Sequence, residues 1–151
     1  MATLRERLMG TWEMEDFKIV EGDMLVDPPL GATETLGGYL IYSADGHMVA
    51  FLSQKDIPRF ADESLDGGTS EERARAHQGI ITYVGTFDVD EVKSTVTHHV
   101  KYASVPNMMG RDLTRICVWQ GERLKLDTPP MVFGGKMKSS YILWRRAKSH
   151  A

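Results

Sequence analysis

The chain lacks several features that would assign it to a class of protein at once. It has a single cysteine, Cys117, among 151 residues. This excludes an intramolecular disulfide and a multi-cysteine zinc site, and it fits a reducing compartment. No apolar run approaches the roughly 20 residues that are needed to cross a bilayer, and residues 1–7 carry no apolar secretory core. We therefore expect a soluble, cytoplasmic protein that is not held in a membrane.

The sequence also lacks a strong charge and the common catalytic motifs. The formal net charge is −3, and the basic residues are scattered except at 144–148, so nucleic acid is a poor candidate partner. There is no Gly-x-Ser-x-Gly elbow, no glycine-rich phosphate loop and no His-Glu-x-x-His. These absences disfavour serine hydrolases, nucleotide-dependent enzymes and zinc proteases. Nothing in the sequence indicates a metal or another cofactor.

What the chain does contain is apolar and polar residues that alternate with a period of two, which is typical of strands. Short turns such as Asp45-Gly46 join most of these segments. The pattern predicts an all-β domain over residues 1–151: an eight-stranded antiparallel up-and-down barrel, whose closure removes exposed sheet edges. The predicted strands are Trp12–Val20, Gly38–Tyr42, His47–Leu52, Gly79–Val89, Lys93–Ala103, Asp112–Gln120, Arg123–Asp127 and Met137–Arg146.

Two connections, residues 21–37 and 53–78, are too long to be simple hairpin turns. The second contains Thr69 and, three residues later, Glu72, a spacing typical of a capping box at the start of a helix. It predicts a short helix over residues 70–77, between the third and fourth predicted strands. Loops of this length are usually lids or binding loops, but they can also plug one end of a barrel. The sequence leaves both interpretations open.

The triplet Gly10-Thr11-Trp12 opens the first predicted strand. Here glycine permits a sharp turn, and tryptophan can plug a barrel end. Together with later blocks in the same order, the chain resembles the bacterial and fungal lipocalin-like domain family, which has a calycin-type barrel. The blocks that carry the resemblance include Pro29-Leu30-Gly31, Leu40–Met48, Tyr83–Phe87, Val96–Val100, Pro106–Gly110, Arg115, Arg123–Leu126 and Leu143–Arg146.

The resemblance implies a structural lock between the two ends of the chain. In the wider lipocalin-type superfamily, the tryptophan of the first strand packs beneath a cationic side chain of the last strand. Here Arg145 or Arg146 would cover Trp12, because a guanidinium stacks favourably on an indole ring. The alternative is that both arginines belong to a solvated tail.

Adjacent histidines on one predicted strand supply the first candidate for a ligand site. His98 and His99 must point to opposite faces of the sheet. If the barrel interior is apolar, His98 points inward together with Val96, Val100 and Tyr102. An inward imidazole could bond a ligand carbonyl or act as an acid or base, or it could be a structural histidine bonded to a neighbouring strand.

The second candidate is Arg115, which shares a strand face with Leu113, Cys117 and Trp119. A buried arginine is costly unless it is paired with an acidic residue or with an anionic or carbonyl ligand. The sequence leaves these alternatives open, as well as an Arg115 that points outward. The predicted ligand-binding residues are Tyr42, Tyr83, His98, Met108, Arg115 and Trp119. His98 and Arg115 are also the candidates for a catalytic role.

These observations favour a barrel that binds a small hydrophobic or aromatic molecule bearing a carbonyl or acid group. The alternative is a cofactor-free cyclase or isomerase of secondary metabolism, which needs mostly shape and orientation and leaves little sequence signature. A third interpretation is an interaction module whose interior is filled by side chains. The sequence does not decide whether the protein is an enzyme, and it leaves a homodimer open.

Overall fold

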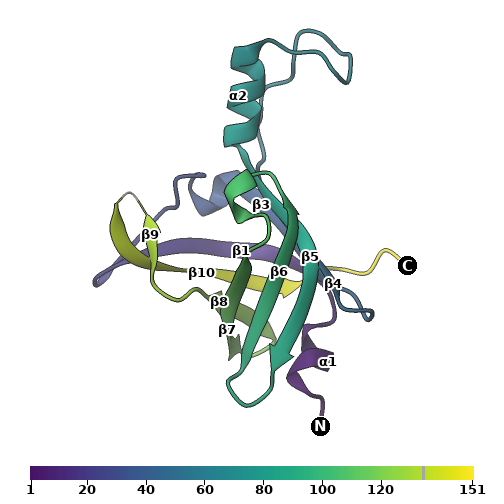
Figure 1. The fold of residues 1–151 in the computed structure, drawn as a ribbon, viewed down its shortest axis with the longest axis vertical. Helices are drawn as coiled ribbons and strands as arrows, with labels where there is room; N and C mark the ends of the chain where they lie inside the picture. Colours follow the sequence, from purple (N-terminus) through teal and green to yellow (C-terminus); the bar gives the residue numbers. More distant parts are fainter. Residues whose placement is uncertain (134) are drawn as a thin grey trace.

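The chain folds into a closed antiparallel barrel. The computed structural model describes residues 1–133 and 135–151. Each strand pairs with an antiparallel neighbour, and pairing of the first with the last closes the sheet (Figure 1), which confirms the predicted fold class. The barrel strands are β1 (Gly10–Glu21), β3 (Leu36–Tyr42), β4 (His47–Gln54), β5 (Ile80–Asp90), β6 (Thr95–Ala103), β7 (Asp112–Gln120), β8 (Arg123–Asp127) and β10 (Lys136–Arg146).

Short elements flank these strands: α1 (Leu4–Leu8), β2 (Met24–Val26), η1 (Thr33–Thr35), α2 (Ser70–Gln78), η2 (Pro106–Met108) and β9 (Met131–Phe133). The predicted helix is α2. It lies between β4 and β5 rather than between strands 3 and 4, because the unpredicted hairpin strand β2 precedes these strands and raises the strand count by one. Among the described residues, no helix combines the length and the hydropathy that crossing a bilayer would need.

One end of the barrel is sealed by α1 and Trp12. Trp12 is only 1% exposed, and its indole N–H donates to the backbone oxygen of Leu8 over 2.9 Å. The guanidinium carbon of Arg146 lies 3.8 Å from the centre of the Trp12 ring. Arg145 points elsewhere and pairs with Glu13 at 3.2 Å. Of the two candidate arginines, Arg146 is therefore the one that stacks on the tryptophan.

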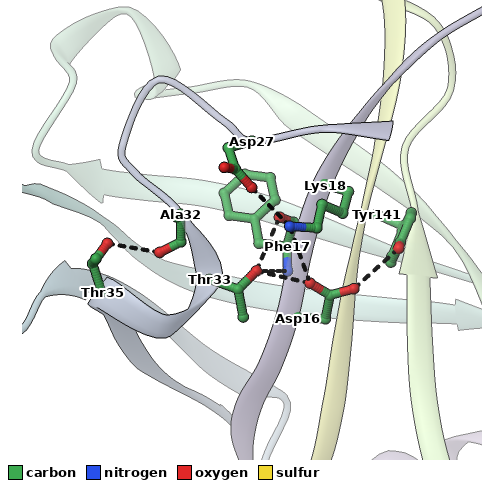
Figure 2. Close-up of polar contacts among 8 residues, drawn as sticks. All are labelled: Asp16, Phe17, Lys18, Asp27, Ala32, Thr33, Thr35 and Tyr141. Atoms are coloured by element: carbon green, nitrogen blue, oxygen red, sulfur yellow. Dashed lines mark hydrogen bonds and ion pairs between the residues drawn. The ribbon is translucent and has the colours of Figure 1, made fainter. Parts of the chain in front are cut away.

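The connection between β2 and β3 is held against the barrel wall by polar contacts (Figure 2). Asp16 follows a β-bulge in β1 and accepts a hydrogen bond from the Thr33 hydroxyl at 2.7 Å. Lys18, on the same strand, pairs with Asp27 at 2.7 Å. Between these anchors Leu30 is buried in the core at 4% exposure. This connection therefore acts as a plug rather than as a free loop.

The connection that carries α2 is different. The helix begins with the expected capping box, in which Thr69 and Glu72 bond each other's backbone N–H groups. No residue of α2 is buried, and the helix stands away from the barrel at the end opposite α1 (Figure 1). The packing of α2 therefore contributes little to the core.

A bulge between β5 and β6 changes which side chains point inward. The register moves from Val84 opposite Tyr102 to Gly85 opposite Val100, so Lys101 has no partner. A Cβ on Gly85 would lie 1.9 Å from the backbone oxygen of His99, so only glycine fits this close approach. The extra residue reverses the alternation. The predicted inward position of Tyr102 is consequently wrong, and its side chain is 58% exposed.

Candidate functional site

A cavity of about 270 Å³ lies inside the barrel. Apolar side chains from most of the strands make up the larger part of its wall. No group of three or more His, Cys, Asp or Glu side chains arranged to hold a metal occurs in residues 1–133 and 135–151. The lining residues are Phe17, Leu40, Ala50, Leu52, Ile81, Tyr83, His98, Met108, Arg111, Leu113, Arg115, Leu126, Thr128, Met131, Ser140, Ile142 and Trp144.

The main polar feature of the cavity wall is His98, which is 1% exposed. Its Nε2 lies 2.6 Å from the hydroxyl of Tyr42, and its Nδ1 lies 2.7 Å from the hydroxyl of Tyr83. Burial lowers the pKa of His98 to about 3, and the nearby charge of Arg115 acts in the same direction. The imidazole is therefore neutral at physiological pH, with one N–H to donate and one lone pair to accept.

The direction of these two hydrogen bonds follows from the burial of Tyr42. Its hydroxyl is deeply buried, and among the described residues its one hydrogen-bond partner is His98. An unsatisfied buried donor is costly, so we assign Tyr42 as the donor to Nε2. Nδ1 then carries the proton and donates to the oxygen of Tyr83. The Tyr83 hydroxyl hydrogen is left free to bond a group in the cavity.

Arg115 adds a positive charge to the same cavity. It lies on the inward face of β7, and its hydrogen bond to the backbone oxygen of Thr114 is long, at 3.3 Å. No ion pair among the described residues includes Arg115. Arg111 is a second lining arginine and is more exposed. Since no Asp or Glu of the described residues lines the cavity, the site is positive and rich in hydrogen-bond donors.

Trp144, on β10, is a further lining residue that the sequence did not single out for the site. It is 2% exposed, and its buried indole N–H has no partner within the described part of the chain. Buried N–H groups normally have a partner. In the sequence, Trp144 was grouped with the basic stretch that follows it, and only barrel closure places it at the cavity.

The other predicted site residues fall in distinct places. Met108 lines the cavity from η2, together with Tyr83, His98 and Arg115. Tyr42 lies behind His98 rather than on the cavity wall. Trp119 lies apart from the cavity, with its ring centre 5.9 Å from that of Trp12 and beneath Arg7 at 3.7 Å. Four residues along a strand span roughly 13 Å, so Trp119 reaches the sealed end although it shares a face with Arg115.

The neighbouring His99 points away from the cavity, as the alternation of a strand requires. Its Nδ1 lies 2.7 Å from Asp112 and its Nε2 lies 2.8 Å from Asp88. Hydrogen bonds to these carboxylates raise the pKa of His99 above its usual value. Cys117 is buried, and burial raises the pKa of its thiol to about 12, which fits an inert thiol.

The sealed end, the cavity inside the barrel and the stacked Trp12–Arg146 pair define a small barrel of the lipocalin type. A family model described as a lipocalin-like domain matches residues 9–147, and the chain belongs to this family. The chain is also similar to the 4'-hydroxy-3'-methoxypropiophenone carrier protein of Aspergillus oryzae. The two are 31% identical over 106 residues, which cover 66% of this chain and 96% of the relative.

Proposed function

We propose that the protein binds and carries a small aromatic molecule bearing a carbonyl or acidic oxygen. The observation that carries this proposal is the apolar cavity whose wall includes the hydrogen-bond donors Tyr83 and Arg115. Its volume of about 270 Å³ is just below the roughly 300–1,000 Å³ of pockets that hold drug-sized ligands. That size suits a ligand with one substituted ring better than a long acyl chain.

The similarity to a carrier protein supports the same proposal. The relative is named for a propiophenone, an aromatic ketone that also bears a hydroxyl and a methoxy group on its ring. Such a molecule combines an apolar body with oxygen acceptors. The cavity offers the complementary surface, because aliphatic and aromatic side chains surround a few donors.

Nothing in the geometry favours the cyclase or isomerase alternative. Both ring nitrogens of His98 are already bonded to tyrosines, and its pKa is lowered to about 3. A general base works best when its pKa is near the operating pH. Catalytic roles for His98 and Arg115 therefore stay predictions without a supporting contact. An interaction module with a solid interior fits poorly with the open volume.

Binding is tested by titrating the protein with 4'-hydroxy-3'-methoxypropiophenone while the tryptophan fluorescence and the heat of binding are recorded. We expect saturable one-to-one binding, quenching of Trp144, and recovery of the ligand unchanged by chromatography. A fatty acid serves as the size control and should not bind. Absence of binding by this ligand and by unsubstituted propiophenone would overturn the proposal, and a chemically altered ligand would favour the enzyme alternative.

A further inference from the structure

Most polar groups of the cavity wall can donate hydrogen bonds or balance a negative charge, and few of them can accept a hydrogen bond. We infer that the cavity holds its aromatic ligand as an oxyanion, such as a phenolate or a carboxylate, in preference to the neutral form. This inference rests on the proposed binding function and specifies the chemical state of the ligand.

The first argument is the direction of the hydrogen-bond chain. Tyr42 donates to His98, and His98 donates to Tyr83, over 2.6 and 2.7 Å. The oxygen of Tyr83 thus already accepts one bond, and its hydrogen is available to the cavity. Accepting a bond polarises an O–H group and strengthens it as a donor. Hydrogen bonds to a charged acceptor are stronger than those to a neutral acceptor.

The second argument is the unbalanced charge of the wall. Arg111 and Arg115 line the cavity, while β1, β3, β4, β8 and β10 contribute no charged lining residue among those described. Arg115 is partly buried and has no carboxylate partner among the described residues. Burying a charge costs free energy unless it is paired. An oxyanion supplies the missing pair, whereas a neutral carbonyl supplies only an acceptor.

The third argument concerns a donor on the opposite strand. Trp144 lines the cavity, is 2% exposed and leaves its indole N–H without a partner in the described part of the chain. Trp144, Tyr83 and Arg115 come from β10, β5 and β7, so the donors of the cavity wall are supplied by three separate strands. The oxygens that face this space without charge, on Thr128 and Ser140, already bond each other at 3.1 Å.

The ionisable groups at the cavity leave a pH range in which the ionisation of the ligand can be observed. The groups that face or adjoin the cavity are Arg111, Arg115, Tyr42, Tyr83, His98 and Cys117. Burial raises the pKa of both tyrosines and takes that of Cys117 to about 12, and it lowers that of His98 to about 3. Between about pH 5 and pH 9, a spectral change of a bound phenol therefore reports the ligand itself.

The test uses 4-hydroxyacetophenone, whose phenol and phenolate absorb at different wavelengths, and 4-methoxyacetophenone, which cannot ionise. At saturating protein, the bound phenol should ionise at least one pH unit lower than it does free in solution. By linkage, this corresponds to tenfold or tighter binding of the anion than of the neutral form. Binding of the methoxy compound should not vary with pH.

Variants test whether the charge of Arg115 causes the shift in the ligand's ionisation. Arg115→Met should abolish most of the shift in the ligand's ionisation, and Arg115→Lys, which keeps the charge, should retain part of it. Arg59→Met, in the exposed loop between β4 and β5, is the matched control and should leave the shift unchanged. Urea denaturation curves confirm that each variant is folded.

The outcomes distinguish the inference from the proposed function. If both compounds bind and the bound phenol ionises at its ordinary pH or above it, the inference is overturned while the binding function stands. If the shift survives in a folded Arg115→Met variant with Tyr83→Phe added, the argument from these two donors is overturned. If neither compound binds the folded protein, the proposed function itself fails.

Discussion

At the scale of single residues, the unusual feature is an imidazole fixed between two phenols. A neutral histidine is both a donor and an acceptor, so it can accept a hydrogen bond from one tyrosine and donate a hydrogen bond to the other. The burial of Tyr42 sets the direction, because that hydroxyl has His98 as its one partner among the described residues. Through this chain of hydrogen bonds, the burial of Tyr42 leaves the Tyr83 hydroxyl as a donor at the cavity wall.

Tyr42→Phe should destabilise the fold, because it removes the partner of a buried nitrogen of His98. We expect the free energy of unfolding to fall by about 1–3 kcal/mol, the cost of leaving such a group unsatisfied. Urea denaturation followed by circular dichroism measures this change. Tyr102→Phe, at an exposed tyrosine of β6, is the control and should change stability by less than about 0.5 kcal/mol. Equal effects of the two substitutions would contradict the buried chain.

Individual side chains differed in how far the sequence predicted them. The inward positions of His98 and Arg115 follow from simple alternation, and both line the cavity. The contact of His98 with two tyrosines joins β3, β5 and β6, and it depends on the closed barrel rather than on any local pattern. Trp119 stays a predicted site residue, but its ring lies beside Trp12, because a shared strand face does not imply a shared height along the barrel. Trp144 reaches the cavity only through closure by β10.

At the scale of the elements, β6 carries two adjacent histidines whose protonation affects stability in opposite directions. His98 has a lowered pKa, so the unfolded chain takes up its proton first as the pH falls below about 6.5, and stability is lost there. His99 has a raised pKa. Its contribution is fully present below the usual value of 6.5 and is lost as the pH rises through the raised value. The strand's alternation separates the two environments.

His99→Gln should isolate the outward half of this pair. The stability advantage of the unaltered protein over His99→Gln should be larger at about pH 5.5 than at about pH 8.5, because the charged imidazole bonds Asp88 and Asp112. Urea denaturation at the two pH values measures the difference. His150→Gln, at the exposed end of the chain, should show no such dependence. An advantage of the same size at both pH values would contradict a stabilising charged pair.

Local signals explain which helices the sequence could predict. Both α1 and α2 begin at a threonine followed three residues later by glutamate, and both form the complete capping box. The signal at Thr69 predicts α2, and the same signal at Thr3 marks the start of α1, which is not among the elements predicted from the sequence. The strand β2 has no comparable signal, because three residues are too few for a period to show.

At the scale of the whole molecule, the barrel separates the parts that hold the fold from the parts that face the cavity. Trp12, Arg146 and α1 seal one end, and the pairing of β1 with β10 joins the two ends of the chain. The cavity lies away from this seal, whereas Trp119 lies at the seal beside Trp12. Strand count and turn spacing predicted the closed barrel, but the open volume depends on how all strands pack together.

Filling the cavity should therefore remove ligand binding without loss of the fold. Ala50 is buried on β4 and lines the cavity, so Ala50→Leu places a larger apolar side chain in open space. Each added methylene that becomes buried contributes about 0.8 kcal/mol, so we expect an unchanged or higher free energy of unfolding. Affinity for the aromatic ketone should fall at least tenfold, as measured by fluorescence titration.

The matched control is Val49→Leu, which enlarges the neighbouring side chain on the outward face of the same strand, where it is 36% exposed. It should leave both affinity and stability close to those of the unaltered protein. Full affinity in a folded Ala50→Leu variant would place the ligand outside the barrel. A loss of about 1–3 kcal/mol, the usual cost of overpacking, would mean that β4 has no open space beside Ala50. With the expected result, the empty volume is maintained for a ligand, since filling it costs the fold nothing.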